Sequence, residues 1–422
     1  MNLHFTNKYL GHFIVLSGLI IITSIVGSGF LNSKSAEAAS NTITITSRYG
    51  QMENPDIAMN EQGDTIIVWQ DKGGKTYEIY AQRFNGDGYP VGFPIRVNQF
   101  RPNDQKNPKV GIDDAGNAIV VWQSYEQDGS GNGIFARKIS PANKRYKEIR
   151  VNDYLLGEQK DPAVAVNEQG NFVVSWVSQR NQRETATDVF AKQFDSDGDP
   201  VSDEFEVSAS PTKISSEPSV AIDSASNFMI VWQGSDEEGY WDIYGQLFNW
   251  KGNPKFSQDI LVNTTTDYDQ NNPSVVANYS KFVVVWESEY AHETLEKTFS
   301  NNINGQVFNG NGKKSGSEIE VTEPIYGHQN EADLIQISAF NILVVWQNYD
   351  KYNEKCWTVR GQTITTGGSV SGDPIMLNAE DERWSQHPVL ASDSSGDVGA
   401  VWVGLNGTRY KKALNYKRAI EF

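Results

Sequence analysis

Cysteine and histidine are scarce in this chain of 422 residues, and each scarcity excludes something. The only cysteine is Cys356, so no disulfide can form within the chain and packing must supply its stability. A thiol of this kind is most often a partly buried small hydrophobe. Only His292, His328 and His387 follow residue 39, and none of them has H-x-H or H-x-x-x-H spacing. We place all three in loops and expect no zinc site.

Positive charge and the short motifs of common enzymes are also missing. The chain has 36 lysines and arginines against 53 acidic residues, a formal charge of −17. Such a surface repels phosphate backbones, so nucleic acid and bare membrane are not expected as partners. No G-x-S-x-G elbow, P-loop or Rossmann fingerprint is present. Paired carboxylates for glycoside hydrolysis stay open, because acidic residues are abundant.

The one long hydrophobic run lies at the N-terminus. Lys8 precedes an apolar stretch over residues 13–31, and Ala36-Glu37-Ala38 offers small residues for cleavage. This order predicts a signal peptide over residues 1–39, followed by one domain over 40–422. The alternative is an uncleaved membrane anchor, since the run is near the spanning length. We expect an exported protein, extracellular, cell-surface or periplasmic, with no membrane insertion after cleavage.

A hydrophobic β-run that ends in tryptophan recurs along the rest of the chain every 53 to 60 residues. Periods of this length with strand-like content are typical of repeat folds. The run is almost continuously apolar, so it should be the most buried strand of its sheet. The tryptophans are Trp69, Trp122, Trp176, Trp232, Trp286, Trp346 and Trp402.

Three more strands accompany each tryptophan run. A proline lies 13 or 14 residues before the tryptophan in six repeats, with Ala332 in the other, and should begin a first strand, where its missing N–H matters least. A Gly/Asn/Asp-rich turn then leads to the tryptophan strand. Two further strands follow in most repeats. This pattern predicts an all-β fold, a seven-bladed β-propeller with four-stranded antiparallel blades.

The two ends of the chain share one blade in this scheme. The last repeat has no clear fourth strand, whereas residues 42–46 form an orphan strand that matches the fourth strand of the other repeats. We expect the N-terminal strand to complete blade seven and close the ring, since this pairs an otherwise open edge.

The repeats resemble the long, Trp-containing propeller repeats of bacterial secreted and cell-surface proteins. The resemblance rests on runs such as QNNPSVVANYSKFVVVW at 270–286 and DIYGQLFNWKGNP at 242–254, and covers residues 42–422. It implies an architecture without a single function. The repeats are not of the WD40 type, nor do they carry an FG-GAP calcium loop or a sialidase Asp-box.

The loops between the second and third strands vary most and carry aromatic residues among carboxylates. Such loops suit carbohydrate stacking, cation capture or a protein partner. The alternative is that acidic loops solvate the surface while aromatics cover the blade tops. The candidate ligand-binding residues are Tyr125, Tyr240, Trp241, Tyr290, Tyr349 and Trp357.

Two polar patterns have a structural and a functional interpretation. Asp195, Asp197 and Asp199 surround a glycine, which suggests a weak Ca²⁺ site, but a hairpin turn is favoured because other repeats tolerate Trp-Lys there. No other cofactor is expected. Glutamines recur three residues before the proline position, and we expect them to bond the backbone of a neighbouring blade. They are Gln105, Gln159, Gln270 and Gln329.

The leading hypothesis is a monomeric, non-enzymatic propeller that binds a surface glycan or a partner protein through its loop-rich face. It follows from the aromatic and acidic loops and from the missing catalytic motifs. One alternative is a glycan-active hydrolase or lyase that uses rim carboxylates. Another is a structural component of the cell envelope.

Overall fold

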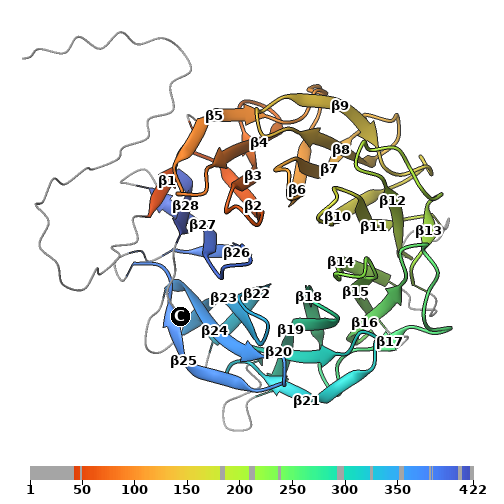
Figure 1. The fold of residues 1–422 in the computed structure, drawn as a ribbon, viewed down its shortest axis with the longest axis vertical. Coiled ribbons are helices and arrows are strands. Elements are labelled where there is room, and N and C mark those ends of the chain that lie inside the picture. The colour runs from red at the N-terminus through yellow and green to blue at the C-terminus, as the bar shows by residue number, and fades with distance from the viewer. Residues whose placement is uncertain are drawn as a thin grey trace, which may run out of the picture.

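The fold was analysed in a computed structural model. It describes residues 42–418 except 48–49, 181–185, 209–213, 236–238, 292–298, 324–326, 351–355, 380–381, 383 and 407–410. The predicted signal peptide lies outside these residues, as does His292. Every regular element described is a β-strand, and the strands form antiparallel sheets arranged around a central axis (Figure 1). Within the described residues, no helix is long and apolar enough to cross a membrane.

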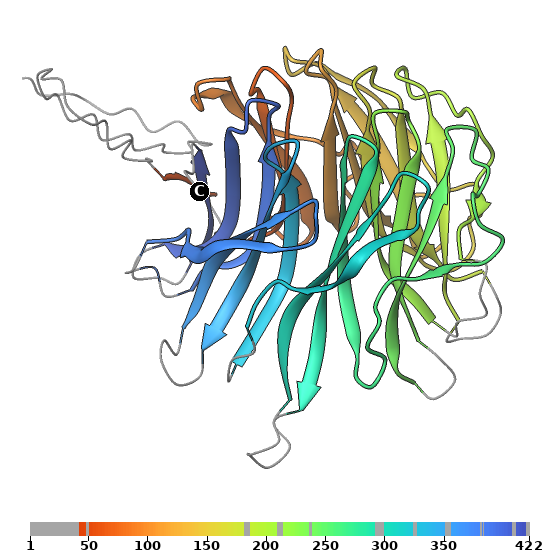
Figure 2. The same cartoon turned by 60° about the horizontal axis from the view of Figure 1, so that its bottom comes forward.

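Each repeat of the sequence forms one sheet unit, and its strands follow one another outward from the axis (Figures 1 and 2). The first unit contains β2 (Met52–Met59), β3 (Thr65–Lys72), β4 (Tyr77–Phe84) and β5 (Pro90–Arg96). The second contains β6 (Gln105–Ile112), β7 (Ala118–Tyr125), β8 (Asn132–Ile139) and β9 (Arg145–Arg150). The third contains β10 (Gln159–Val166), β11 (Phe172–Ser178), β12 (Asp188–Phe194) and β13 (Phe205–Glu206).

The later units follow the same plan. The fourth contains β14 (Ile214–Ile222), β15 (Phe228–Ser235), β16 (Trp241–Phe248) and β17 (Ile260–Leu261). The fifth contains β18 (Gln270–Asn278), β19 (Lys281–Ala291), β20 (Phe299–Phe308) and β21 (Lys314–Glu320). The sixth contains β22 (Gly327–Gln336), β23 (Asn341–Asp350), β24 (Trp357–Thr365) and β25 (Val370–Met376). One parallel bridge, Asn301 to His328, links the fifth and sixth units.

The last unit combines the two ends of the described chain. It contains β26 (Gln386–Ser392), β27 (Val398–Asn406), β28 (Lys411–Arg418) and, at its outer edge, β1 (Ile43–Ile45). Strand β1 runs antiparallel to β28, with Ile43 opposite Tyr416. The N-terminal strand therefore occupies the place of a fourth strand, as the repeat pattern led us to expect.

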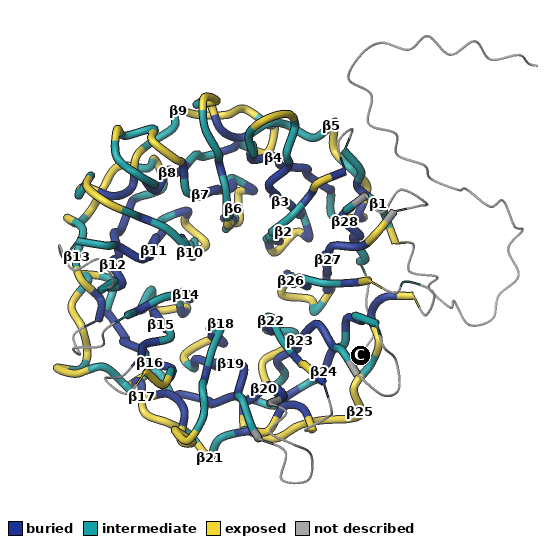
Figure 3. The backbone as a smooth tube through the Cα atoms, turned by 180° about the vertical axis from the view of Figure 1, so that it is seen from behind, coloured by how far each residue is buried: buried dark blue, intermediate teal, exposed yellow. Residues whose placement is uncertain are grey.

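The tryptophan strands form the core between units. All seven tryptophans are at most 2% exposed, whereas the outer strands are largely open to solvent (Figure 3). Trp122 packs in one cluster with Ile66 and Val68 of the preceding unit. Trp69 packs in another with Val401 of the last unit. A four-stranded sheet cannot bury both faces alone, and this stacking on neighbours removes them from water.

The glutamines before the proline position bond differently from the expectation. Gln105, Gln159 and Gln270 each accept a hydrogen bond from the indole Nε1 of the tryptophan in their own unit, at 2.9, 3.1 and 2.9 Å. The predicted bond to the backbone of a neighbouring unit is therefore wrong for these three. The glutamine begins the first strand, and the indole N–H on the adjacent second strand of the same unit lies within its reach.

We predicted that the proline begins the first strand, and this is wrong, because the proline lies inside that strand. In the first unit β2 begins at Met52, and the pairing with β3 skips a register between Glu53 and Asp56. The same skip recurs in all seven first strands. A bulge leaves residues out of the ladder, so a proline without an N–H is tolerated there.

Candidate functional site

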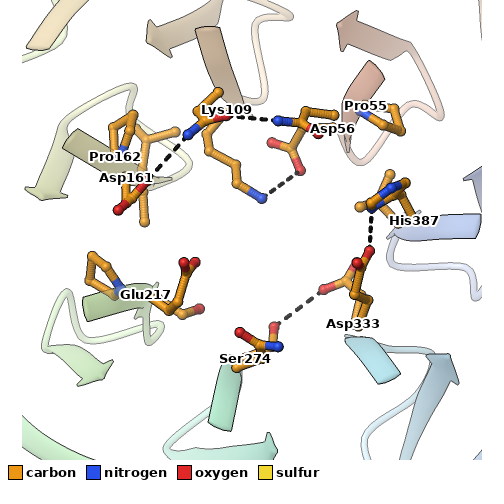
Figure 4. A pocket seen from close by; sticks show the side chains of 18 of the residues that line it. Pro55, Asp56, Lys109, Asp161, Pro162, Glu217, Ser274, Asp333 and His387 are labelled. Carbon is orange, nitrogen blue, oxygen red and sulfur yellow. Dashed lines mark hydrogen bonds and ion pairs between the residues drawn. The ribbon is translucent and has the colours of Figure 1, made fainter. Parts of the chain in front are cut away.

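The bulges of the seven first strands surround a cavity on the central axis (Figure 4). Its volume is about 560 Å³, and it is lined by the proline position of each unit and by its neighbours on both sides. The bulge lies near the end of the sheet at which the second strand passes to the third, since Glu53 pairs with Gln70 close to the end of β3. The cavity thus lies toward the loop-rich end predicted from the sequence.

The residue before each proline or alanine adopts a left-handed backbone conformation. Its φ lies between 47° and 52° in all seven units, a region that non-glycine residues seldom occupy. A residue before proline is biased toward extended backbone, so the bulge imposes this conformation against the local preference. Every one of these residues is polar, and all line the cavity: Asn54, Asn107, Asp161, Glu217, Asn272, Glu331 and His387.

The residue after each tryptophan holds the left-handed residue of the next unit in place. Its side-chain oxygen accepts the backbone N–H of the left-handed residue in the next unit, which satisfies a donor that the bulge removes from the ladder. In the remaining two units this residue is Val177 or Val403. The five bonds are Gln70 to Asn107 (2.9 Å), Gln123 to Asp161 (3.2 Å), Gln233 to Asn272 (2.8 Å), Glu287 to Glu331 (2.8 Å) and Gln347 to His387 (3.1 Å).

A second set of cavity residues follows the proline. Asp56 Oδ2 accepts the backbone N–H of Val110 at 2.7 Å, and Lys109 Nζ lies 3.9 Å from its other oxygen. Asp333 accepts the N–H of Leu390 at 2.8 Å and the hydroxyl of Ser274 at 3.3 Å. Loss of water around the group raises the pKa of Asp56 to about 6 and also raises the pKa of Asp333. These two carboxylates join neighbouring units.

Glu217 and Glu331 differ from that pair, because their carboxylates are open to the cavity. The enclosure of Glu217 raises its pKa, and the charges of Asp161 and Glu331 act in the same direction. Glu331 pairs with Nδ1 of His387. The two carboxylates come from the fourth and sixth units, so they face the cavity from separate sheets. Glu217 is biased toward the protonated form, and Glu331 pairs with an imidazole.

The cavity as a whole is acidic. Five carboxylates line it, those of Asp56, Asp161, Glu217, Glu331 and Asp333, against the single lysine Lys109 and His387. Burial also raises the pKa of Asp161. A site of this charge favours neutral or cationic ligands over anionic ones.

The aromatic residues predicted to bind ligand lie at the loop-rich end, and none lines the cavity. Tyr125 at the end of β7 and Tyr240 before β16 are 42% and 47% exposed. Trp241 begins β16 and Tyr290 lies in β19. Tyr349 and Trp357 are brought together, with ring centroids 5.2 Å apart. The structure therefore forms one aromatic pair and distributes the other four residues over the second, fourth and fifth units.

The predicted calcium residues form the turn between β12 and β13. The Asp195 carboxylate accepts the backbone N–H groups of Asp197 and Asp199 at 3.0 and 2.9 Å, and Gly198 has a φ of 89°. This is the Asx geometry of a tight hairpin turn. No three His, Cys, Asp or Glu side chains in the described part of the chain gather as metal ligands. Calcium binding here stays a prediction.

His387 and the other residues of the left-handed set were missed by the sequence reasoning. His387 lies in β26 and lines the cavity, rather than in a surface loop. The signal was present, because a polar residue precedes the proline position in all seven repeats. The regular alternation of side chains along a strand would not predict that these side chains face the axis, because the bulge interrupts that alternation.

Comparison with known proteins identifies the fold. No family model matches the chain, and no curated protein matches it either. A structure of an ulvan lyase of polysaccharide lyase family PL25, bound to -[GlcA(1-4)Rha3S]-, is 10% identical over 87% of this chain and 93% of its own, with a TM-score of 0.57. The polysaccharide lyase Uly1 is 7% identical over 88% and 89%, with a TM-score of 0.52.

A third similar structure is a protein of unknown function from Dyadobacter fermentans. It is 8% identical over 91% of this chain and 98% of its own, with a TM-score of 0.52. At these identities the likeness concerns the fold. The chain is thus an all-β protein of propeller-like architecture, built from four-stranded antiparallel sheets.

Proposed function

We propose that this chain is an exported, seven-bladed β-propeller whose ring is closed by β1, and that it hydrolyses a polysaccharide at its axial cavity. Closure is supported by the pairing of β1 with β28 and by the packing of Trp69 against Val401. Export is supported by the signal-like residues 1–39. A glycan substrate is supported by the fold shared with two polysaccharide lyases.

The observation that carries the hydrolase proposal is the contrast between Glu217 and Glu331. Glycoside hydrolysis uses one carboxylic acid to protonate the leaving oxygen and one carboxylate as base or nucleophile. Two carboxyl groups in different surroundings divide into these roles. Glu217, with its raised pKa, is assigned as the acid, and Glu331, paired with His387, as the carboxylate.

The charge of the cavity favours hydrolysis over elimination in this proposal. A lyase acting on a uronate must neutralise the carboxylate of the sugar before a proton is removed beside it. Here Lys109 is the single lysine among five carboxylates, and Asp56 already lies beside it. We therefore assign a neutral or amino-sugar glycan, which an acidic cavity attracts or tolerates.

The test is the release of reducing ends from a panel of neutral and amino-sugar polysaccharides. Glu217→Gln and Glu331→Gln keep the side-chain volume and should each lower the rate by about 10²–10⁴-fold. Glu168→Gln is the matched control, because Glu168 is exposed in the turn between β10 and β11 at the opposite end of the sheets, and it should leave the rate unchanged. Full activity in both cavity variants would refute the assignment.

A second candidate is glycan binding without turnover, which the Tyr349–Trp357 pair favours. Two adjacent rings at the loop-rich end can stack on a sugar face. In that case the wild type retains a glycan on an array, releases no reducing ends, and loses retention in Tyr349→Ala but not in Glu217→Gln.

A further inference from the structure

A cluster of positive charge on this acidic protein lies far from the axis, between the first and second units. A surface cavity of about 400 Å³ is lined there by Arg96, Arg137, Lys144 and Arg145, together with three amide side chains, those of Asn98, Gln99 and Asn143. Arg96 ends β5, Arg137 lies in β8, and Arg145 begins β9 directly after Lys144 in the preceding turn. These are outer strands of their units (Figure 1).

The β8–β9 hairpin accounts for most of this charge. Residues 132–150 contain six lysines and arginines and one acidic residue, a net charge of +5 within a chain of −17. At physiological ionic strength exposed charges are screened beyond about 8 Å, so the local cations dominate the field at this cavity.

The guanidinium groups are held mainly by neutral acceptors, so their charge is not cancelled. Arg137 donates to the carbonyls of Tyr146 and Val97 at 2.7 and 2.6 Å, and Arg145 donates to the carbonyl of Arg96 at 2.7 Å. Each guanidinium has five N–H donors, so several on each stay free for a ligand. The Nε of Arg96 is buried with no hydrogen-bond partner.

The two nearby carboxylates are largely engaged elsewhere. Glu78 receives the amide of Asn98 at 2.6 Å and lies 3.8 Å from Arg96. Glu148 receives the backbone N–H of Gln99 and the amide of Gln127. Even when both carboxylates are counted against the four lining cations, the net charge around this cavity is positive. Like-charge repulsion from Arg145 contributes to the lowered pKa of Arg137, after loss of water.

The other repeats show what Arg137 has replaced. The equivalent position is Gln82, Gln246, Gln306 and Gln362 in the first, fourth, fifth and sixth units. There each glutamine amide donates to backbone carbonyls of its own outer hairpin, as Gln82 does to Arg83 at 2.7 Å. Arginine at this place keeps a bond to its own hairpin, at Tyr146, but also reaches the carbonyl of Val97 and brings a charge that the hairpin itself does not need.

We propose that this cavity is an anion-binding site that retains a polymer bearing sulfate or carboxylate groups, separate from the axial cavity. Arginine pairs with such oxyanions through two parallel N–H bonds, and the flanking lysine adds a point charge. Lys144 also lies 4.6 Å from the ring centroid of the half-exposed Tyr146, which offers an apolar surface beside the charges. A site for an acidic glycan beside a cavity for a neutral one fits retention on a mixed polysaccharide matrix.

The experiment measures the affinity of the full chain for dextran sulfate and for uncharged dextran of the same length. The test variant is Lys144→Gln with Arg145→Gln, two exposed residues. The matched control is Lys251→Gln with Lys313→Gln, which removes two exposed lysines from the equivalent turns of the fourth and fifth units. Circular dichroism of all variants verifies that they are folded.

We expect dextran sulfate to bind at least 10-fold more tightly to the wild type and to the control than to the test variant. The binding should weaken steeply with added salt, and dextran should not bind. Equal affinity in the test variant, or equal binding of dextran, would overturn the proposal. So would binding to vesicles of anionic lipid without binding to dextran sulfate. Because Glu217→Gln leaves this site intact, loss of turnover there with retention here separates the two proposals.

Discussion

Replacing a buried tryptophan by phenylalanine should cost different amounts in the second and fourth units, although Trp122 and Trp232 are both 0% exposed. Trp122 donates its indole N–H to Gln105 at 2.9 Å, whereas the indole N–H of Trp232 is buried without a partner. Both replacements remove the same ring atoms from equivalent places between units. The packing loss is about 1–3 kcal/mol in each and largely cancels in the comparison.

The hydrogen bond sets the difference. Trp122→Phe leaves the Gln105 oxygen buried and unpaired, which costs about 1–3 kcal/mol, whereas Trp232→Phe removes a donor that was already unpaired. We expect Trp122→Phe to lower the free energy of unfolding by about 1–3 kcal/mol more than Trp232→Phe. For a chain of this size that difference is a gap of a few degrees in Tm.

Differential scanning calorimetry at one scan rate measures both variants against the wild type. Adding Gln105→Leu to Trp122→Phe removes both partners and should recover part of the loss, and Gln105→Leu alone completes a double-mutant cycle. Equal losses in the two single variants, or no recovery in the double variant, would show that the bond between Gln105 and Trp122 contributes nothing to stability.

Two further predictions concern the cavity residues. Because the pKa of Asp56 is about 6 in the folded chain and 3.8 as the ordinary value, the folded state binds this proton more tightly, and the free energy of unfolding should fall as pH rises from 4 to 6. Asp56→Asn should reduce this slope in chemical unfolding at several pH values, and an unchanged slope would contradict the assignment. Gln123→Val should cost about 1–3 kcal/mol, because the N–H of Asp161 and an amide N–H of Asn107 lose their acceptor. Val177 stands at the equivalent place of the third unit, so the fold should survive, and a loss near zero by urea titration would show that water replaces the glutamine.

The parts of the fold that follow from local apolar pattern could be read from the sequence. The run that ends at Trp69 is apolar at nearly every position, as a strand covered on both faces requires. The unpaired strand at residues 42–46 could be assigned to the last repeat, because only that repeat lacks a clear fourth strand. The bulge could not be read, because a residue before proline avoids the conformation that Asn54 adopts. Pairing on both sides of the bulge overrides that preference.

The cavity was missed for a related reason. Glu217 and Glu331 are more than a hundred residues apart, and only the arrangement of the sheets around an axis brings them to one cavity. The partner of Gln105 was assigned wrongly because an amide can bond an indole or a backbone group equally well, and sequence spacing does not rank the two. The aromatic loops were found from composition, which locates a face of the molecule but not a site on it.

The pairing of β1 with β28 also constrains the order in which the chain can fold. Ile43 pairs with Tyr416, which lies more than 370 residues later in the chain. The backbone groups of β1 can therefore pair only after β28 is in place. Loop closure over such a separation is slow, and we expect the units from β2 onward to form their own hairpins first. The last sheet then assembles in a late step. Strand β1 has three residues, so we expect it to separate from β28 before the other strands of that sheet separate from one another. Its backbone amides should therefore be among the first to exchange in a hydrogen-exchange experiment.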